Sequence, residues 1–150
     1  MATLESLTGA IDQVIAFFNA RRMDLPDGFF DRKTQFVING APFETLLGQP
    51  PNDPLILMLS RGPAGYRFTV TGLQHAVRNA HIDRGDLDAV GDPSKVKTQL
   101  WLSGQLRDTG EPVNVMIAVT LTLTAAGSVE IASASMDEPT LEKIRQARRS

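Results

Sequence analysis

Residues 66–86, YRFTVTGLQHAVRNAHIDRGD, contain both histidines of this 150-residue chain. Their alternating pattern predicts one long strand, because successive side chains of a strand point to opposite faces. One face would carry a mixture of polar and small apolar side chains: Thr69, Thr71, Leu73, His75, Val77, Asn79 and His81. A strand that places two imidazoles and an amide among apolar neighbours predicts one wall of a small-molecule pocket.

Two segments before this stretch predict helices. From residue 4 to 21, apolar residues recur at steps of three and four, which is the spacing of an amphipathic helix. Further along, Asp53 and Pro54 have the order of an N-cap followed by a first-turn proline, and they precede the apolar run 55–59. We expect a short buried helix there that ends at Gly62 and Pro63, although so short an apolar run also fits a buried strand. Between the two segments, residues 34–39 predict a strand that ends in an Asn39-Gly40 turn.

The chain after residue 86 predicts an antiparallel meander. Residues 96–107, 113–124 and 129–136 are alternating runs, and the connections 108–111 and 125–128 are short enough for hairpins. A last helix from Pro139 would turn Leu141 and Ile144 inward. Its basic residues would point outward: Lys143, Arg145, Arg148 and Arg149.

The two faces of the predicted sheet differ in character. The face expected to lie against the helices is strongly apolar: Val96, Leu100, Leu102, Val113, Val115, Ile117, Val119, Leu121, Leu123, Val129 and Ile131. The opposite face carries small or softly apolar residues: Gln99, Trp101, Ser103, Met116, Ala118, Thr120, Ala132, Ala134 and Met136. Because a monomer rarely exposes a continuous face with so little charge, we expect a homodimer formed through this outer face.

Composition excludes several classes of function. Fifteen basic and seventeen acidic residues leave a net charge of −2, which argues against nucleic-acid binding. The chain has no cysteine, so it has no disulfide, thiolate nucleophile or sulfur-ligated metal. The length predicts one domain over residues 1–150. No leader or membrane-spanning segment is recognisable in the sequence, so we expect a cytoplasmic protein that contacts neither membrane nor nucleic acid.

The order of elements resembles the nuclear transport factor two-like (cystatin-like) superfamily. Its fold is α+β: N-terminal helices packed in a curved, mostly antiparallel sheet that forms a cone-shaped α+β barrel. The segment FFNARRMD, the His75-to-Asn79 spacing and the pair Gly85-Asp86 are most similar to SnoaL-like proteins. That resemblance implies an apolar pocket at the wide end of the cone and a cofactor-independent isomerase, dehydratase or cyclase that transfers protons next to a carbonyl, with no metal.

The resemblance to scytalone dehydratase-like members lends His75 the role of catalytic base. Asp24 and Asp31 are candidate acids near the mouth of the cone, as is Glu44. A hydrogen-bonded structural histidine and solvated loop carboxylates are the alternative interpretations. Two departures are visible: Gln99 to Trp101 replace a second histidine, and Phe17 and Phe18 stand where isomerase-type members have a tyrosine. The residues expected to line a ligand are Phe17, Phe18, Leu73, Val77, Asn79, Thr98 and Leu100.

Three classes of function therefore stay open from the sequence. The chain is a small acid/base enzyme, a carrier or sensor that binds an apolar molecule without converting it, or a dimeric accessory or scaffold protein. In the last case the chain's own aromatic side chains would fill the cone.

Overall fold

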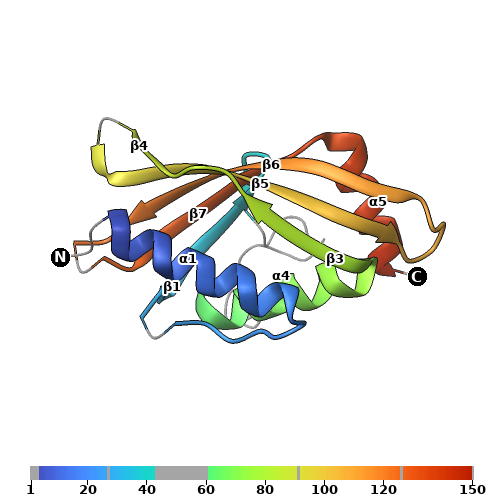
Figure 1. The fold of residues 1–150 in the computed structure, drawn as a ribbon, viewed down its shortest axis with the longest axis horizontal. Helices are drawn as coiled ribbons and strands as arrows, with labels where there is room; N and C mark the ends of the chain where they lie inside the picture. The colour runs from blue at the N-terminus through green and yellow to red at the C-terminus, as the bar shows by residue number, and fades with distance from the viewer. Residues whose placement is uncertain (1–3, 27, 43–60, 91, 126, 150) are drawn as a thin grey trace.

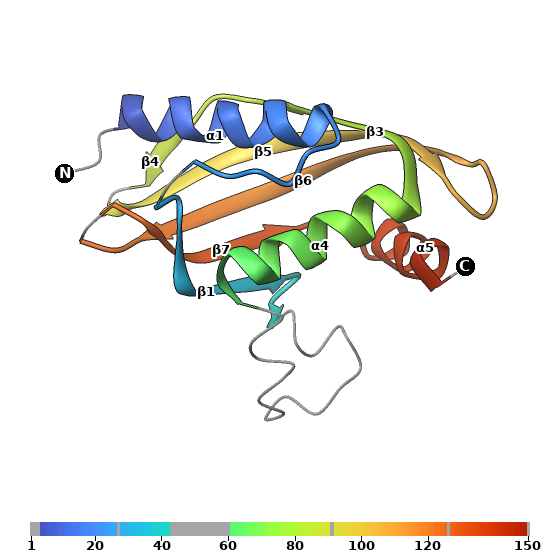
Figure 2. The same ribbon diagram turned by 90° about the horizontal axis from the view of Figure 1, so that it is seen from below.

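A computed structural model describes residues 4–26, 28–42, 61–90, 92–125 and 127–149. Within these residues the chain forms helices α1 (Leu4–Asn19), α4 (Gly62–Ala76) and α5 (Glu138–Arg149). The strands are β1 (Phe30–Ile38), β2 (Ala41–Pro42), β3 (Val77–Arg84), β4 (Asp88–Val90), β5 (Asp92–Leu106), β6 (Pro112–Leu123) and β7 (Val129–Ser135). Helices α1 and α4 lie on the same side of a curved sheet, and α5 lies beside the end of α4 (Figure 1 and Figure 2).

The described strands form one seven-stranded sheet in the order β2-β1-β7-β6-β5-β3, with β4 paired to β5. β5, β6 and β7 form the predicted antiparallel meander, and β1 pairs with β7 in parallel. The α+β class and the mostly antiparallel sheet are thus confirmed. The predicted Asn39-Gly40 turn is confirmed as well: both residues have positive φ, 51° and 80°, as the tight hairpin between β1 and β2 requires.

The predicted long strand over residues 66–86 is wrong in its first half. The chain runs as helix α4 up to Ala76 and as strand β3 only from Val77. The buried residues of α4 follow a helical spacing that the alternation concealed: Gly62, Gly65, Tyr66, Val70 and Ala76. The exposed residues follow the same spacing on the opposite side: Ala64, Arg67, Thr71 and His75. Packing against β1 and α5 outweighs the strand preference of the β-branched residues here.

Gly62 and Pro63 begin helix α4, whereas the sequence suggested that they end a helix. Pro63 stands in the first turn, where its missing N–H has no helical partner to lose. Gly62 has a φ of 64°, and a Cβ on it would lie 2.5 Å from the carbonyl oxygen of Arg32 in β1. The glycine therefore lets the start of the helix approach β1 closely. The helix predicted over residues 55–59 and the acid Glu44 lie outside the described residues.

Helix α1 is confirmed, and its end is fastened to β3. Leu7, Ile11 and Phe18 are buried along one stripe. At the last residue of the helix, the Asn19 side chain donates to the Ile82 carbonyl oxygen (3.0 Å) and accepts from the Ile82 N–H (2.8 Å). Arg84 on the same strand forms an ion pair with Asp12 of α1. These contacts fix α1 over the edge of the sheet.

The inner face of the sheet forms the core, with one correction on β7. Residues such as Leu102, Val115 and Ile117 are buried beneath the helices, as predicted. A register shift after Thr122 places Ile131 opposite Thr122 on the outer face. Ala132 and Ala134 then pair with Leu121 and Val119, so they face inward rather than outward. A one-residue slip in a strand exchanges its faces, and alternation alone could not reveal where the slip occurs.

The C-terminal helix is confirmed with its apolar side inward. Leu141 and Ile144 are buried, and Lys143 is exposed. The expectation that Arg148 points outward is wrong: the residue is half-buried, and its guanidinium lies over the Phe68 ring of α4. The carboxylate of Asp137 accepts hydrogen bonds from the Thr140 N–H and hydroxyl at the start of the helix, which lowers the pKa of Asp137. Among the described residues, no helix is long and apolar enough to cross a membrane.

Candidate functional site

The inner side of helix α4 places a single phenol in the core. Tyr66 is only 9% exposed, and its ring lies 5.3 Å from that of Phe30, centroid to centroid. Phe18, Val70 and Leu102 belong to the same cluster. Burial raises the pKa of Tyr66 to about 12, because the phenolate is poorly solvated among these apolar side chains. Near neutral pH, Tyr66 is therefore a neutral hydrogen-bond donor within the core.

The hydroxyl of Tyr66 forms no hydrogen bond with the described part of the chain. A buried O–H that donates to a carbonyl oxygen gains more than it would in water, because the surroundings have a low dielectric constant. Such a donor stabilises the negative charge that develops on a carbonyl oxygen when a neighbouring proton is removed. The inner side of α4 therefore carries one of the two groups that proton transfer next to a carbonyl needs.

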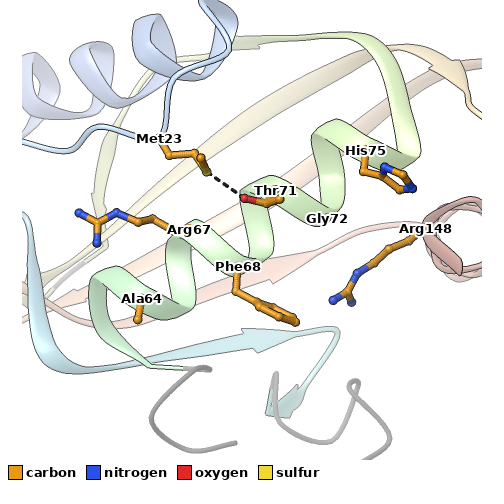
Figure 3. A pocket seen from close by; sticks show the side chains of 8 residues that line it. All are labelled: Met23, Ala64, Arg67, Phe68, Thr71, Gly72, His75 and Arg148. Atoms are coloured by element: carbon orange, nitrogen blue, oxygen red, sulfur yellow. Dashed lines mark hydrogen bonds between the residues drawn. The ribbon is translucent and has the colours of Figure 1, made fainter.

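The outer side of α4 forms the floor of an open groove (Figure 3). The residues that line it come from the segment after α1, from α4 and from α5: Met23, Ala64, Arg67, Phe68, Thr71, Gly72, His75 and Arg148. The Thr71 hydroxyl donates to the Met23 sulfur at 2.8 Å on one side of the helix. On the other side, the Arg148 guanidinium lies 4.9 Å from the centre of the Phe68 ring.

His75 lies on this outer side, at the last turn of α4, and its side chain is exposed. Residues 66 and 75 are nine positions apart, about two and a half turns of helix, so their side chains leave opposite sides. The prediction that His75 faces the apolar interior with Leu73 and Val77 is therefore wrong, because it assumed a strand. The catalytic role of His75 stays a prediction.

One neighbour of His75 is a cation. The Arg107 Nη1 atom lies 2.7 Å from His75 Nδ1 and 3.1 Å from Nε2. A guanidinium only donates, so the imidazole is the acceptor in this contact. His81 is also exposed, on β3, and its Nε2 lies 3.2 Å from the Asp83 carboxylate.

The two candidate acids lie at the surface. Asp24 is exposed, and its carboxylate pairs with Arg22 at 2.6 Å. Asp31 is an exposed residue of β1, and its backbone carbonyl accepts a hydrogen bond from the Thr34 hydroxyl. The roles of Asp24 and Asp31 as acids beside His75 stay predictions.

The structure brings together four of the seven residues expected to line a ligand. Phe18 and Val77 are buried in the cluster that contains Tyr66, and Leu73 and Leu100 pack against it. Thr98 is buried, and its hydroxyl donates to the Gly85 carbonyl oxygen at 3.2 Å.

The other two residues of that set lie outside the cluster. Phe17 is half-buried beneath the Arg22 guanidinium. Asn79 is exposed in a bulge of β3 with a φ of 56°, and its amide donates to the Gln105 side chain.

Sequence reasoning missed Tyr66 as a site residue. The signal that could have found it is the spacing of Tyr66, Val70, Leu73 and Val77, which steps by four, three and four. Together with Pro63 at the start, this pattern indicates a helix whose apolar side includes the tyrosine. In the described residues, no group of three or more histidine or acidic side chains is placed to hold a metal ion.

No protein-family model matches the sequence, and no curated protein matches it in a sequence comparison. Solved structures do match. TsrD from Streptomyces laurentii has a TM-score of 0.70 at 15% identity, with 98% of each chain covered. A SnoaL-like polyketide cyclase from Agrobacterium tumefaciens has a TM-score of 0.64 at 17% identity, covering 97% of this chain and 98% of that one. TerC, crystallised with polyporic acid, has a TM-score of 0.65 at 12% identity, covering 96% and 98%.

Further matches include a SnoaL-like polyketide cyclase from Jannaschia and an NTF2-like protein from Exiguobacterium. At these identities the likeness concerns the fold. The chain therefore has the α+β fold of the SnoaL-like and nuclear transport factor two-like proteins.

Proposed function

We propose that this chain is a SnoaL-like domain that receives a small apolar molecule with a carbonyl or hydroxyl group on the inner side of α4. Tyr66 would donate a hydrogen bond to the oxygen of that molecule. The observation that carries the proposal is the buried side chain of Tyr66, whose raised pKa keeps its hydroxyl protonated. The crystallisation of TerC, which has the same fold, with polyporic acid supports a small molecule as the ligand.

The reaction that suits this arrangement is proton transfer next to a carbonyl without a cofactor, as in an isomerase, dehydratase or cyclase. In such a step a base removes the α-proton, and the electron pair moves onto the carbonyl oxygen, which Tyr66 stabilises as a donor. His75, Asp24 and Asp31 remain the candidate bases from the sequence. α4 directs His75 away from Tyr66, and both acids are exposed as well, so substitution of each residue in turn has to identify the base.

The binding part of the proposal is tested with 1-tetralone and 2-naphthol as probes. Tyr66 is the only tyrosine, so protein labelled with ¹³C-tyrosine reports this ring alone. Both probes should shift its signals. The Tyr66→Phe variant should bind them about two- to tenfold more weakly, as expected for one lost hydrogen bond. Unshifted signals, or equal affinity of the variant, would contradict the proposal.

The catalytic part is tested by α-deuterium exchange of 1-tetralone in D₂O. The wild-type protein should accelerate the exchange, and Tyr66→Phe should reduce that acceleration. Asp24→Asn, Asp31→Asn and His75→Ala then identify the base. Binding without any exchange would favour a carrier or sensor over an enzyme.

A second candidate function is that of a dimeric accessory protein, and the outer sheet face supports it. Trp101 and Met116 are 41% and 45% exposed and stand opposite one another on β5 and β6. We propose that a second copy covers this pair, because two large apolar side chains side by side tend not to remain in water. Light scattering should give twice the 16.3 kDa chain mass. Trp101→Glu should give monomers, whereas the exposed Glu130→Gln should not.

A further inference from the structure

The groove on the outer side of α4 combines an apolar floor with cationic sides. Ala64, Phe68 and Gly72 form the floor along the helix. Arg67 lies on the side of Met23, and Arg148 lies on the opposite side (Figure 3). None of the described residues that line the groove is acidic, although acidic residues outnumber basic ones in the chain as a whole.

The Arg148 guanidinium is positioned by two features of α4. The Phe68 ring lies beneath it at 4.9 Å, a stacking contact that orients the planar group. A Cβ on Gly72 would lie 2.8 Å from the Nε atom of Arg148, so the glycine lets the side chain lie close against the helix. Arg148 therefore presents its N–H groups from a defined place at the edge of the groove.

The end of the groove at His75 is also positively charged. The Arg107 side chain contacts the His75 ring there at 2.7 Å. Met23, held by the Thr71 hydroxyl, supplies an apolar wall across the helix. Two arginines, Arg107 and Arg148, thus lie near the His75 end of the groove. Arg67 lies on the far side, and the surface between them is apolar.

We propose that this groove binds an organic anion with an apolar body, specifically a carboxylate on an aliphatic chain. The carboxylate would lie against Arg148 beside His75, and the chain would extend along Phe68 toward Ala64. A guanidinium pairs with a carboxylate through two parallel hydrogen bonds, and the floor removes the chain from water. The volume of the groove, about 560 Å³, is in the range of small-molecule sites. The site is separate from that of Tyr66, because it lies on the opposite side of α4.

The test uses octanoate, with 1-octanol and octylammonium as probes of equal length and different charge. Binding to the full chain is measured by calorimetry and by NMR shifts of the two histidine rings. Octanoate should bind, should shift the His75 signals and should exceed both other probes in affinity about tenfold, as a charge-assisted pair with arginine predicts. Its binding should weaken with added salt.

Three matched variants locate the carboxylate. Arg148→Gln should weaken octanoate about tenfold, and Arg67→Gln should weaken it less, because that side chain lies farther from the charged end. Arg32→Gln removes an exposed arginine of β1 that does not line the groove, and it should have no effect. The affinity for 1-octanol should be the same in all three variants.

Several outcomes would overturn the proposal. These are no octanoate binding at millimolar concentration, equal binding of 1-octanol, or an Arg148→Gln variant that behaves like Arg32→Gln. A shift of the Tyr66 signals, with affinity lost in Tyr66→Phe, would place the anion at the inner site instead. Conversely, failure of 1-tetralone to reach Tyr66 leaves the octanoate result unaffected, so the two proposals fail separately.

Discussion

The two sides of helix α4 meet different environments although their residues are neighbours in the chain. The inner side carries Tyr66 and Val70 into the core, where burial keeps a phenol neutral up to high pH. The outer side carries Arg67 and His75 beside the solvent, where charged groups collect around an apolar groove. One helix thus separates a buried, neutral phenol on one side from exposed cations on the other.

Adjacent substitutions should show this division most strongly in the free energy of unfolding. Tyr66→Ala should lower it by about 3–5 kcal/mol, because a large buried ring is replaced by a cavity. Arg67→Ala, one residue away, should change it by no more than about 0.5 kcal/mol, because its side chain is exposed. Urea denaturation of both variants measures the difference. Similar midpoints for the two variants would show that α4 does not pack as described.

Alkaline pH should lower the free energy of unfolding through Tyr66, by a smaller amount than the Tyr66→Ala substitution does. The pKa of Tyr66 rises from 10.0 in the unfolded chain to about 12 in the folded one. The folded state therefore holds the phenolic proton more tightly, so this stabilisation is fully present below pH 10 and is lost as the pH rises toward 12. Its size is about 2–3 kcal/mol, from 1.36 kcal/mol for each pKa unit.

Two measurements follow the alkaline effect. Phenolate absorbance at 295 nm should appear only well above pH 10 in the folded protein. Urea midpoints at pH 8, 10 and 11 should fall more in the wild type than in Tyr66→Phe, which carries no phenol to ionise. Phenolate absorbance that rises around pH 10 in the folded protein would mean that the ring is solvated.

Gly62→Ala tests the close packing of the start of α4 against β1. The substitution places a Cβ in a left-handed backbone conformation and 2.5 Å from the Arg32 carbonyl oxygen, so α4 must move away from β1. We expect a loss of about 1–3 kcal/mol. The solvent-exposed Gly9 of α1 is the control, because a Cβ there meets no atom within 4 Å. Gly9→Ala should be neutral or stabilising, since alanine favours a helix.

The sequence by itself determined the elements that depend on local patterns. The stripe of α1, the Asn39-Gly40 turn, the meander of β5, β6 and β7 and the apolar side of α5 all follow from spacing, turn chemistry and short connections. Each of these signals lies within a few residues, so it persists whatever the rest of the chain does.

Tertiary structure decided what those patterns left ambiguous. Residues 66–76 satisfy both an alternating and a helical reading, and packing against β1 and α5 selects the helix, which moves His75 to the surface and Tyr66 into the core. The slip at Glu130 exchanges the faces of Ala132 and Ala134 in the same way, because pairing with β6 sets the register. The groove joins Met23, α4 and Arg148, which lie far apart in the chain, so only the folded arrangement places their side chains around one site.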